Sequence, residues 1–227
     1  MNIRYLGHAS FTLEHEGTNL LLDPFLTSNP KAAVSADDVE ADAILLTHGH
    51  FDHIEDVVSI AKRTGAAVVS MKEVSDEIAG KLDEGHEVYD PNIGGTVSFN
   101  WGSVRLVPAW HSSTTPNGTV SIPTGLVVEF GGKRIYHLGD TALFSDLQLV
   151  KRRGEIDVAL MCIGGHYTMD RHDGVIAAEF VEAKQIIPCH YDTFPPIETD
   201  ADAFKSEVEA AGTAEVVVLA PGETHSP

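Results

Sequence analysis

The chain has 227 residues, 43% of them hydrophobic, which suffices for the core of one large α/β domain and predicts a single domain over residues 1–227. Its 34 acidic residues outnumber 15 basic ones and give a formal net charge of −19, which argues against a nucleic-acid partner because phosphate backbones require a basic stripe. No apolar run approaches the roughly 18 residues of a membrane helix, and no signal-like segment opens the chain, so we expect a cytoplasmic protein with no membrane span.

Short strand-like and helical segments alternate along the whole chain. Apolar and β-branched runs predict strands at Ile3–Leu6, Ser10–Leu13, Asn19–Leu22, Ala43–Leu46, Ala67–Ser70, Val97–Trp101, Val104–Ala109, Gly125–Phe130, Arg134–Leu138, Val158–Ile163, Gln185–Ile187 and Glu215–Leu219. Apolar residues at helical spacing predict helices at Ile54–Arg63, Val74–Leu82, Leu143–Arg152, Gly174–Ala183 and Ala201–Ala211. Hairpin-like turns early in each half, followed by alternating strands and helices, favour two sheets with helices outside.

A cluster of imidazoles and one carboxylate directly follows the apolar run Ala43–Leu46. Its members are His48, His50, Asp52 and His53. Imidazole nitrogen and carboxylate oxygen are ligands that suit zinc, manganese or iron. A loop that leaves a rigid strand can aim such side chains at one point, so the cluster predicts a metal site at the end of a buried strand.

Three later residues each follow an apolar segment rich in β-branched side chains. They are His111, Asp140 and His190. Each alone has an ordinary structural explanation, since Gly-Asp-Thr, for example, is a common turn or helix cap. As an ordered set after the first cluster, they supply the further ligands that a site for two metal ions needs.

The pattern His-x-His-x-Asp-His, with these later residues in order, resembles the signature of the metallo-β-lactamase superfamily over nearly the whole chain. The resemblance implies the α+β class and a four-layer αβ/βα sandwich, in which two mixed β-sheets carry helices on their outer faces. In that fold the metal site lies along one edge between the sheets.

The resemblance also implies a dinuclear site with two divalent metal ions per chain. One ion would be held by His48, His50 and His111. The second would be held by Asp52, His53 and His190, with Asp140 bridging the two. Histidine-rich ligation favours zinc, while the carboxylates would also tolerate manganese, iron or nickel.

Three more residues are placed near the site by the resemblance. Asp23, in an Asp-Pro turn, matches an aspartate that braces a metal-bound histidine, although a simple strand-ending turn would also explain it. His8, together with Gly139–Asp146 and His190–Pro195, resembles a branch of small hydrolases related to L-ascorbate-6-phosphate lactonase. In that branch His8 would contact substrate or leaving group, or else be structural. His166 follows a double glycine and would be a substrate contact or an outer group of the site.

Two hypotheses of different classes follow. The first is a hydrolase whose metal-bridging hydroxide cleaves a small ester, lactone or phosphodiester, an anionic substrate included, with Asp52 also able to orient or accept a proton. The loop from Ser112 to Thr124 should line the pocket. The alternative is a metal-loaded binding or regulatory protein without efficient turnover. Relatives in this branch can form homo-oligomers, and a homo-oligomer is the partner that the resemblance allows besides the substrate.

Overall fold

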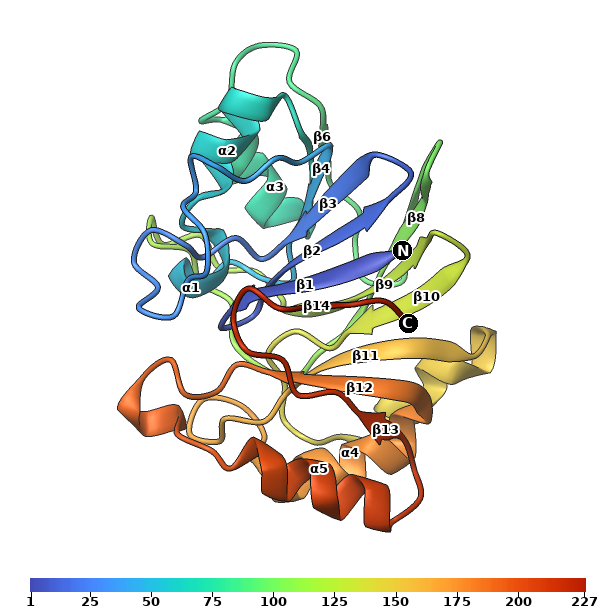
Figure 1. Cartoon of the computed structure of the whole chain (residues 1–227). Coiled ribbons are helices and arrows are strands. Elements are labelled where there is room, and N and C mark those ends of the chain that lie inside the picture. Colours follow the sequence, from blue (N-terminus) through green and yellow to red (C-terminus); the bar gives the residue numbers. More distant parts are fainter.

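Two seven-stranded mixed sheets form the centre of the computed structural model, which describes residues 1–227 (Figure 1). The first sheet has the order β14-β1-β2-β3-β4-β5-β6 and contains β1 (Asn2–Gly7), β2 (Ser10–His15), β3 (Thr18–Leu22), β4 (Ala43–Leu45), β5 (Ala67–Val69), β6 (Val88–Tyr89) and β14 (Thr224–His225). The second has the order β13-β12-β11-β10-β9-β8-β7 and contains β7 (Thr96–Phe99), β8 (Gly102–Pro108), β9 (Thr124–Phe130), β10 (Lys133–His137), β11 (Ile156–Cys162), β12 (Ala183–Cys189) and β13 (Glu215–Val216).

Both sheets follow the same plan along the chain. Each begins with antiparallel strands, β1 to β3 in the first and β7 to β10 in the second, and continues with parallel ones. The central parallel strands β4 and β5 are buried at every residue, and β11 at all but Asp157, because both of their faces are covered. Their carboxyl ends open towards one edge of the sandwich, where polar loops can converge.

Helices cover the outer face of each sheet, so the molecule has four layers (Figure 1). The first sheet carries α1 (Phe51–Ile54), α2 (Val57–Thr64) and α3 (Lys72–Ala79). The second carries the 3-10 helix η1 (Ser145–Arg153), α4 (Arg171–Val181) and α5 (Ala201–Ala210), with the short η2 (Pro195–Ile197) in a loop. Separate apolar cores lie between the sheets and beneath each helical layer. The predicted αβ/βα sandwich is therefore confirmed.

The helix expected at Ile54–Arg63 is two helices, because the chain breaks at Asp56. The backbone N–H of Asp56 donates to the Pro24 carbonyl at 3.2 Å, while its buried carboxylate accepts from the N–H groups of Leu26 and Thr27. These bonds tie the segment after β3 to the turn between α1 and α2. A helical pattern cannot register such contacts, because they involve residues about thirty positions apart.

Other boundaries also differ from the sequence expectation. The helix expected at Leu143–Arg152 is the 3-10 helix η1, and the strand expected at Glu215–Leu219 pairs only over Glu215–Val216. Helix α4 starts at Arg171, where the Asp170 carboxylate caps it, and ends at Val181, so Ala183 belongs to β12 instead of the helix. The short strands β6 and β14 were not predicted, because two residues carry no recognisable period. No helix has the length and apolar character needed to cross a membrane.

Gly102 at the start of β8 provides a test of the second sheet. Its φ is +149°, and a Cβ there would lie 1.9 Å from the Glu129 carbonyl oxygen of β9. We expect Gly102→Ala to lower the free energy of unfolding by about 3 kcal/mol, measured by guanidinium unfolding. Gly65→Ala is the matched control, because φ is +76° but nothing lies within 4 Å; it should cost only about 1 kcal/mol. Equal costs would contradict the clash.

Candidate metal centre

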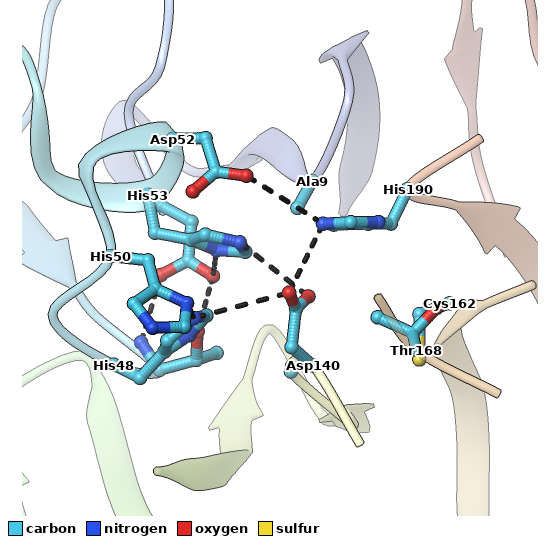
Figure 2. Close-up of polar contacts among 12 residues, drawn as sticks. Ala9, His48, His50, Asp52, His53, Asp140, Cys162, Thr168 and His190 are labelled. Carbon is cyan, nitrogen blue, oxygen red and sulfur yellow. Dashed lines mark hydrogen bonds and ion pairs between the residues drawn. The ribbon is translucent and has the colours of Figure 1, made fainter. Parts of the chain in front are cut away.

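Loops from both sheets meet at one edge and bring all seven predicted metal ligands together. All of them except His111 are labelled in Figure 2. The segment after β4 supplies four of them, two from the loop itself and two from α1. The ends of β8, β10 and β12 lead to the other three, His111, Asp140 and His190. The strand ends fix these positions because β4, β8, β10 and β12 are each hydrogen-bonded to a neighbouring strand on both sides.

The side chains form two groups, each with ligand atoms within 4.8 Å of one another. One group contains His48, His50, His111 and Asp140. The other contains His8, Asp52, His53 and His190. Apart from His8, this is the division that the resemblance implies.

Asp140 lies between the two groups (Figure 2). Its Oδ2 is 3.5 Å from His111 Nε2 on one side and 3.1 Å from His190 Nε2 on the other. Its Oδ1 is 3.5 Å from His53 Nε2. One carboxylate thus faces both groups, as a bridging ligand must.

Three of the atoms that face this centre lack hydrogen-bond partners. His53 Nε2, Asp140 Oδ1 and His190 Nε2 are buried and make no hydrogen bond. His48 Nε2 and His50 Nδ1, a further pair of ring nitrogens, face each other at 3.0 Å. Buried polar atoms are almost always paired. A cluster of unpaired nitrogen and oxygen atoms is therefore explained if these atoms bind cations. The donor set therefore accommodates divalent metal ions.

The charges around the centre favour a positive charge between the two ligand groups. Burial opposes the charged form of His53, yet Asp140 and Asp23 outweigh it and hold the pKa of His53 well above its usual value. Burial would also raise the pKa of Asp140, but His190 and His53 hold it well below the usual range. The carboxylates are therefore ionised, and the centre stabilises cationic partners.

Asp23 connects the metal-ligand loop to the end of β3. It is fully buried, and its Oδ1 accepts from the Thr47 backbone N–H at 2.8 Å. Its Oδ2 accepts from Thr47 Oγ1 at 2.6 Å and from His53 Nδ1 at 2.8 Å. Because His53 donates from Nδ1 to Asp23, Nε2 is the ring atom that faces the centre, where a bound metal ion would displace its proton and take up its lone pair. This is the bracing position predicted for Asp23.

His8 lies behind Asp52 and is not part of the cavity wall. The imidazole is fully buried, with Nε2 3.1 Å from Asp52 Oδ2 and Nδ1 2.9 Å from Thr193 Oγ1. Burial and the neighbouring His190 lower the pKa of His8 to about 4, so it is neutral at pH 7. A neutral ring that donates to Asp52 and accepts from Thr193 holds the Asp52 carboxylate in place. The predicted substrate contact by His8 stays a prediction that this position does not favour.

His166 is exposed and does not line the cavity. Its ring packs edge-on against Tyr167, with centroids 4.5 Å apart, and Tyr167 is the residue that reaches the cavity. The residue predicted from the sequence, His166, is therefore the neighbour of the lining residue Tyr167. The aromatic residue directly after His166 was the available signal.

An open cavity of about 720 Å³ lies over the centre. Four predicted ligands form part of its wall: His50, Asp52, His111 and Asp140. The remaining wall consists of Phe51, Ser112, Thr114, Pro116, Tyr167 and Phe194. The loop Ser112–Thr124 contributes three of these, which confirms that it lines the pocket. Phe194 was missed, although it stands in the quoted segment after His190.

Helix α3 anchors that loop through Glu77. The Glu77 carboxylate accepts from Thr115 Oγ1 and, at 2.7 Å, from Asn117 Nδ2. On the other side of the loop, Ser113 Oγ accepts from the Gly49 N–H at 3.0 Å. A Cβ at Gly49 would lie 2.9 Å from Thr115 Cγ2, so the ligand loop and the cavity loop pack closely. The cavity wall is thus fixed to both the helix and the metal-ligand loop.

Known proteins resemble this chain over almost its full length. Residues 2–190 match the family model described as a β-lactamase superfamily domain. A UPF0173 metal-dependent hydrolase of Thermus thermophilus is 46% identical over 225 residues, covering 98% of this chain and 97% of the relative. One from Methanopyrus kandleri is 45% identical and covers 99% of each chain. The structure of Igni18, a metallo hydrolase of Ignicoccus hospitalis, superposes with a TM-score of 0.90 at 36% identity, over 99% of this chain and 97% of that one.

Asp23→Asn tests the brace on His53. Asparagine tolerates the positive φ of +44° at this position but cannot accept both the Thr47 hydroxyl and the His53 N–H through one nitrogen. We expect metal affinity to fall roughly 10- to 100-fold, measured by chelator competition. Asp56→Asn is the matched control: it alters another buried carboxylate, bonded to Leu26 and Thr27, and should lower stability without changing metal affinity. Equal affinity losses would contradict a specific role for Asp23.

Glu77 gives the cavity wall a pH dependence. Partial burial opposes its charge, but Lys81, Thr115 and other donors lower the pKa of Glu77 to about 2. A depressed carboxyl pKa stabilises the folded state above the usual value near 4.5 and loses this contribution as the pH falls towards 2. Glu77→Gln should therefore speed amide hydrogen exchange of Thr115 and Thr119 at pH 6, and the wild type should approach the variant between pH 4.5 and 2.

Asp76→Asn is the control for this measurement, since the Asp76 carboxylate on the same helix bonds only the exposed Lys72. It should leave exchange in the loop unchanged. Unaltered exchange in Glu77→Gln would show that Glu77 does not anchor the loop.

Proposed function

This chain belongs to the β-lactamase superfamily domain family and to its UPF0173 metal-dependent hydrolases, and from that premise we propose that it is a dinuclear metallohydrolase of a small ester, lactone or phosphodiester. The observation that carries the proposal is the open cavity directly over the two ligand groups. Structural metal sites are closed by their protein ligands, whereas hydrolytic sites leave coordination positions that water and substrate can reach. The narrower relation to lactonases rests on the sequence resemblance alone.

Each residue of the centre has a role in this proposal. His48, His50 and His111 would hold one cation, Asp52, His53 and His190 the other, with Asp140 shared. Bound divalent cations would lower the pKa of water from 15.7 to roughly 7 and polarise the substrate oxygen. Zinc suits the nitrogen-rich donor set, with manganese, iron or nickel as alternatives.

Asp52 occupies the position from which a carboxylate could orient the attacking water or accept its proton. It lies in the cavity wall, and Oδ2 is held by the neutral His8 at 3.1 Å. Burial would raise the pKa of Asp52, but the neighbouring imidazoles of His190 and His8 lower it strongly, so the group is ionised. His8 then acts on the reaction only by fixing the direction of that carboxylate.

The second candidate function is a metal-loaded binding or regulatory protein on the same scaffold. Such a binding protein would have the same metal ligands. In it, however, water and substrate would not reach the cations at the same time. The exposed walls of the cavity, including Phe51 and Tyr167, favour the hydrolase because they leave that access open.

Metal content and turnover measured on the same preparations test the proposal. We expect gently purified or reconstituted protein to contain two metal ions per chain by mass spectrometry, one for each ligand group. It should hydrolyse at least one substrate in a panel of p-nitrophenyl esters, lactones and bis-p-nitrophenyl phosphate. Asp140→Ala should reduce turnover by at least roughly 100-fold, because it removes the shared carboxylate, and His48→Ala should also lower metal occupancy.

His86→Ala is the control, since this imidazole bonds only the Ala66 carbonyl. Its metal content and turnover should equal those of the wild type. Full metal loading without turnover of any substrate would favour the binding protein, and failure to bind metal under reconstitution would contradict both functions.

A further inference from the structure

The wall of the cavity differs in chemistry from the metal-ligand residues at its base. Apart from the metal-ligand candidates, the wall consists of Phe51, Ser112, Thr114, Pro116, Tyr167 and Phe194. Three of these side chains are aromatic, and none is charged. A substrate held by this wall is therefore held by apolar and ring contacts beyond its reacting group.

Exposed apolar side chains concentrate around the same cavity. The protein exposes seven large hydrophobic residues, and five lie on the segments that form or flank the cavity walls: Phe51, Trp110, Val120, Ile122 and Tyr167. Burying large apolar groups is normally favourable, so an exposed cluster indicates a surface that a ligand covers. Trp110 extends the cluster towards Phe144, with ring centroids 6.3 Å apart.

Positive side chains are missing from this region. No lysine or arginine lines the cavity. The loop that forms one wall is instead anchored by acidic residues of α3, Glu77 at Thr115 and Glu73 at Ser121. With a net charge of −19, the protein repels anions at long range. Sites that recognise phosphodiesters usually contact the phosphate oxygens with arginine or lysine as well as with metal ions, and this cavity offers neither arginine nor lysine.

From these observations we propose that the substrate is a neutral carboxylic ester or lactone with a large alkyl or aryl group, which lies against Phe51, Tyr167 and Phe194 while its carbonyl faces the metal centre. This inference rests on the proposed function, because it names the substrate class of the same site. The metal ligands alone would permit either a neutral ester or an anionic phosphodiester, and the cavity wall favours the neutral ester.

The reaction consumes one water molecule. The water oxygen bonds to the carbonyl carbon, and the single bond between that carbon and the alkoxy oxygen breaks with its electron pair passing to oxygen. One water proton ends on the released alcohol, and the acid product releases the other to solvent at neutral pH. For a lactone, the alcohol and the acid are the two ends of one product. No other reactant is required.

Paired substrates of increasing apolar size test the inference in the metal-loaded enzyme. We expect kcat/KM to rise roughly tenfold from p-nitrophenyl acetate to the butyrate, which adds two methylene groups. Likewise kcat/KM for γ-octanolactone should exceed kcat/KM for γ-butyrolactone. Comparison of the lactones with the p-nitrophenyl esters shows which of the two classes the enzyme prefers. Bis-p-nitrophenyl phosphate should be the poorest substrate. Preference for the phosphodiester, or no gain with chain length, would overturn the inference and leave the hydrolase proposal intact.

Tyr167 variants connect the size effect to the wall. Tyr167→Ala should remove most of the gain from acetate to butyrate, chiefly through KM, while Tyr167→Phe should retain it because the ring is kept. Leu149→Ala is the matched control: Leu149 is 54% exposed, as against 53% for Tyr167, but lies in η1 away from the cavity wall. It should leave the size effect unchanged. A gain that persists in Tyr167→Ala would overturn the assignment of this wall.

A binding measurement separates failure of the inference from failure of the hydrolase proposal. Trp101→Phe leaves Trp110, which is 67% exposed beside the cavity, as the single tryptophan. In this variant the neutral ketone 2-undecanone, which cannot be hydrolysed, should change Trp110 fluorescence at lower concentration than dibutyl phosphate, an anion of similar length. Tighter binding of the ketone supports the ligand class even without turnover. Equal or weaker binding would overturn it.

Discussion

An unpaired polar atom in a protein interior destabilises the fold, and several such atoms lie together where the two sheets meet. Unpaired atoms of His53, Asp140 and His190 face one another, while His53 Nδ1 is bonded to Asp23 behind them. Metal ions at this point would convert unsatisfied groups into ligands. The surrounding structure serves this purpose, because it holds each ligand side chain in place for the metal ions.

Backbone strain marks the same positions. His8, Asp23 and His190 all have positive φ values, which non-glycine residues rarely adopt. Each lies at or just beyond a strand end, and the His190 N–H donates to the His8 carbonyl at 2.7 Å. The two sheets therefore connect directly behind the centre. Sheet packing and hydrogen bonds such as those of Asp23 offset the strain, so the fold can hold these side chains in directions that relaxed turns would not give.

Much of the architecture could be predicted from the sequence, because parallel strands buried on both faces appear as apolar runs such as Ala43–Leu46 and Val158–Ile163. Boundaries were wrong where distant residues decide them. Asp56 divides an expected helix by binding the backbone after β3, and the two-residue strands β6 and β14 exist only because a neighbouring strand pairs with them. Local patterns contain no information about such partners.

The sequence by itself determined the donor set, because imidazoles and carboxylates after successive strands restrict the chemistry to metal binding wherever those strand ends meet. Only the tertiary structure decided what surrounds these donors. It placed His8 behind Asp52, turned Tyr167 instead of His166 towards the cavity, and fixed the wall through Glu77. The physical reason is that the identity of a ligand depends on side-chain chemistry, whereas the shape and charge of a cavity depend on residues far apart in the chain that packing brings together.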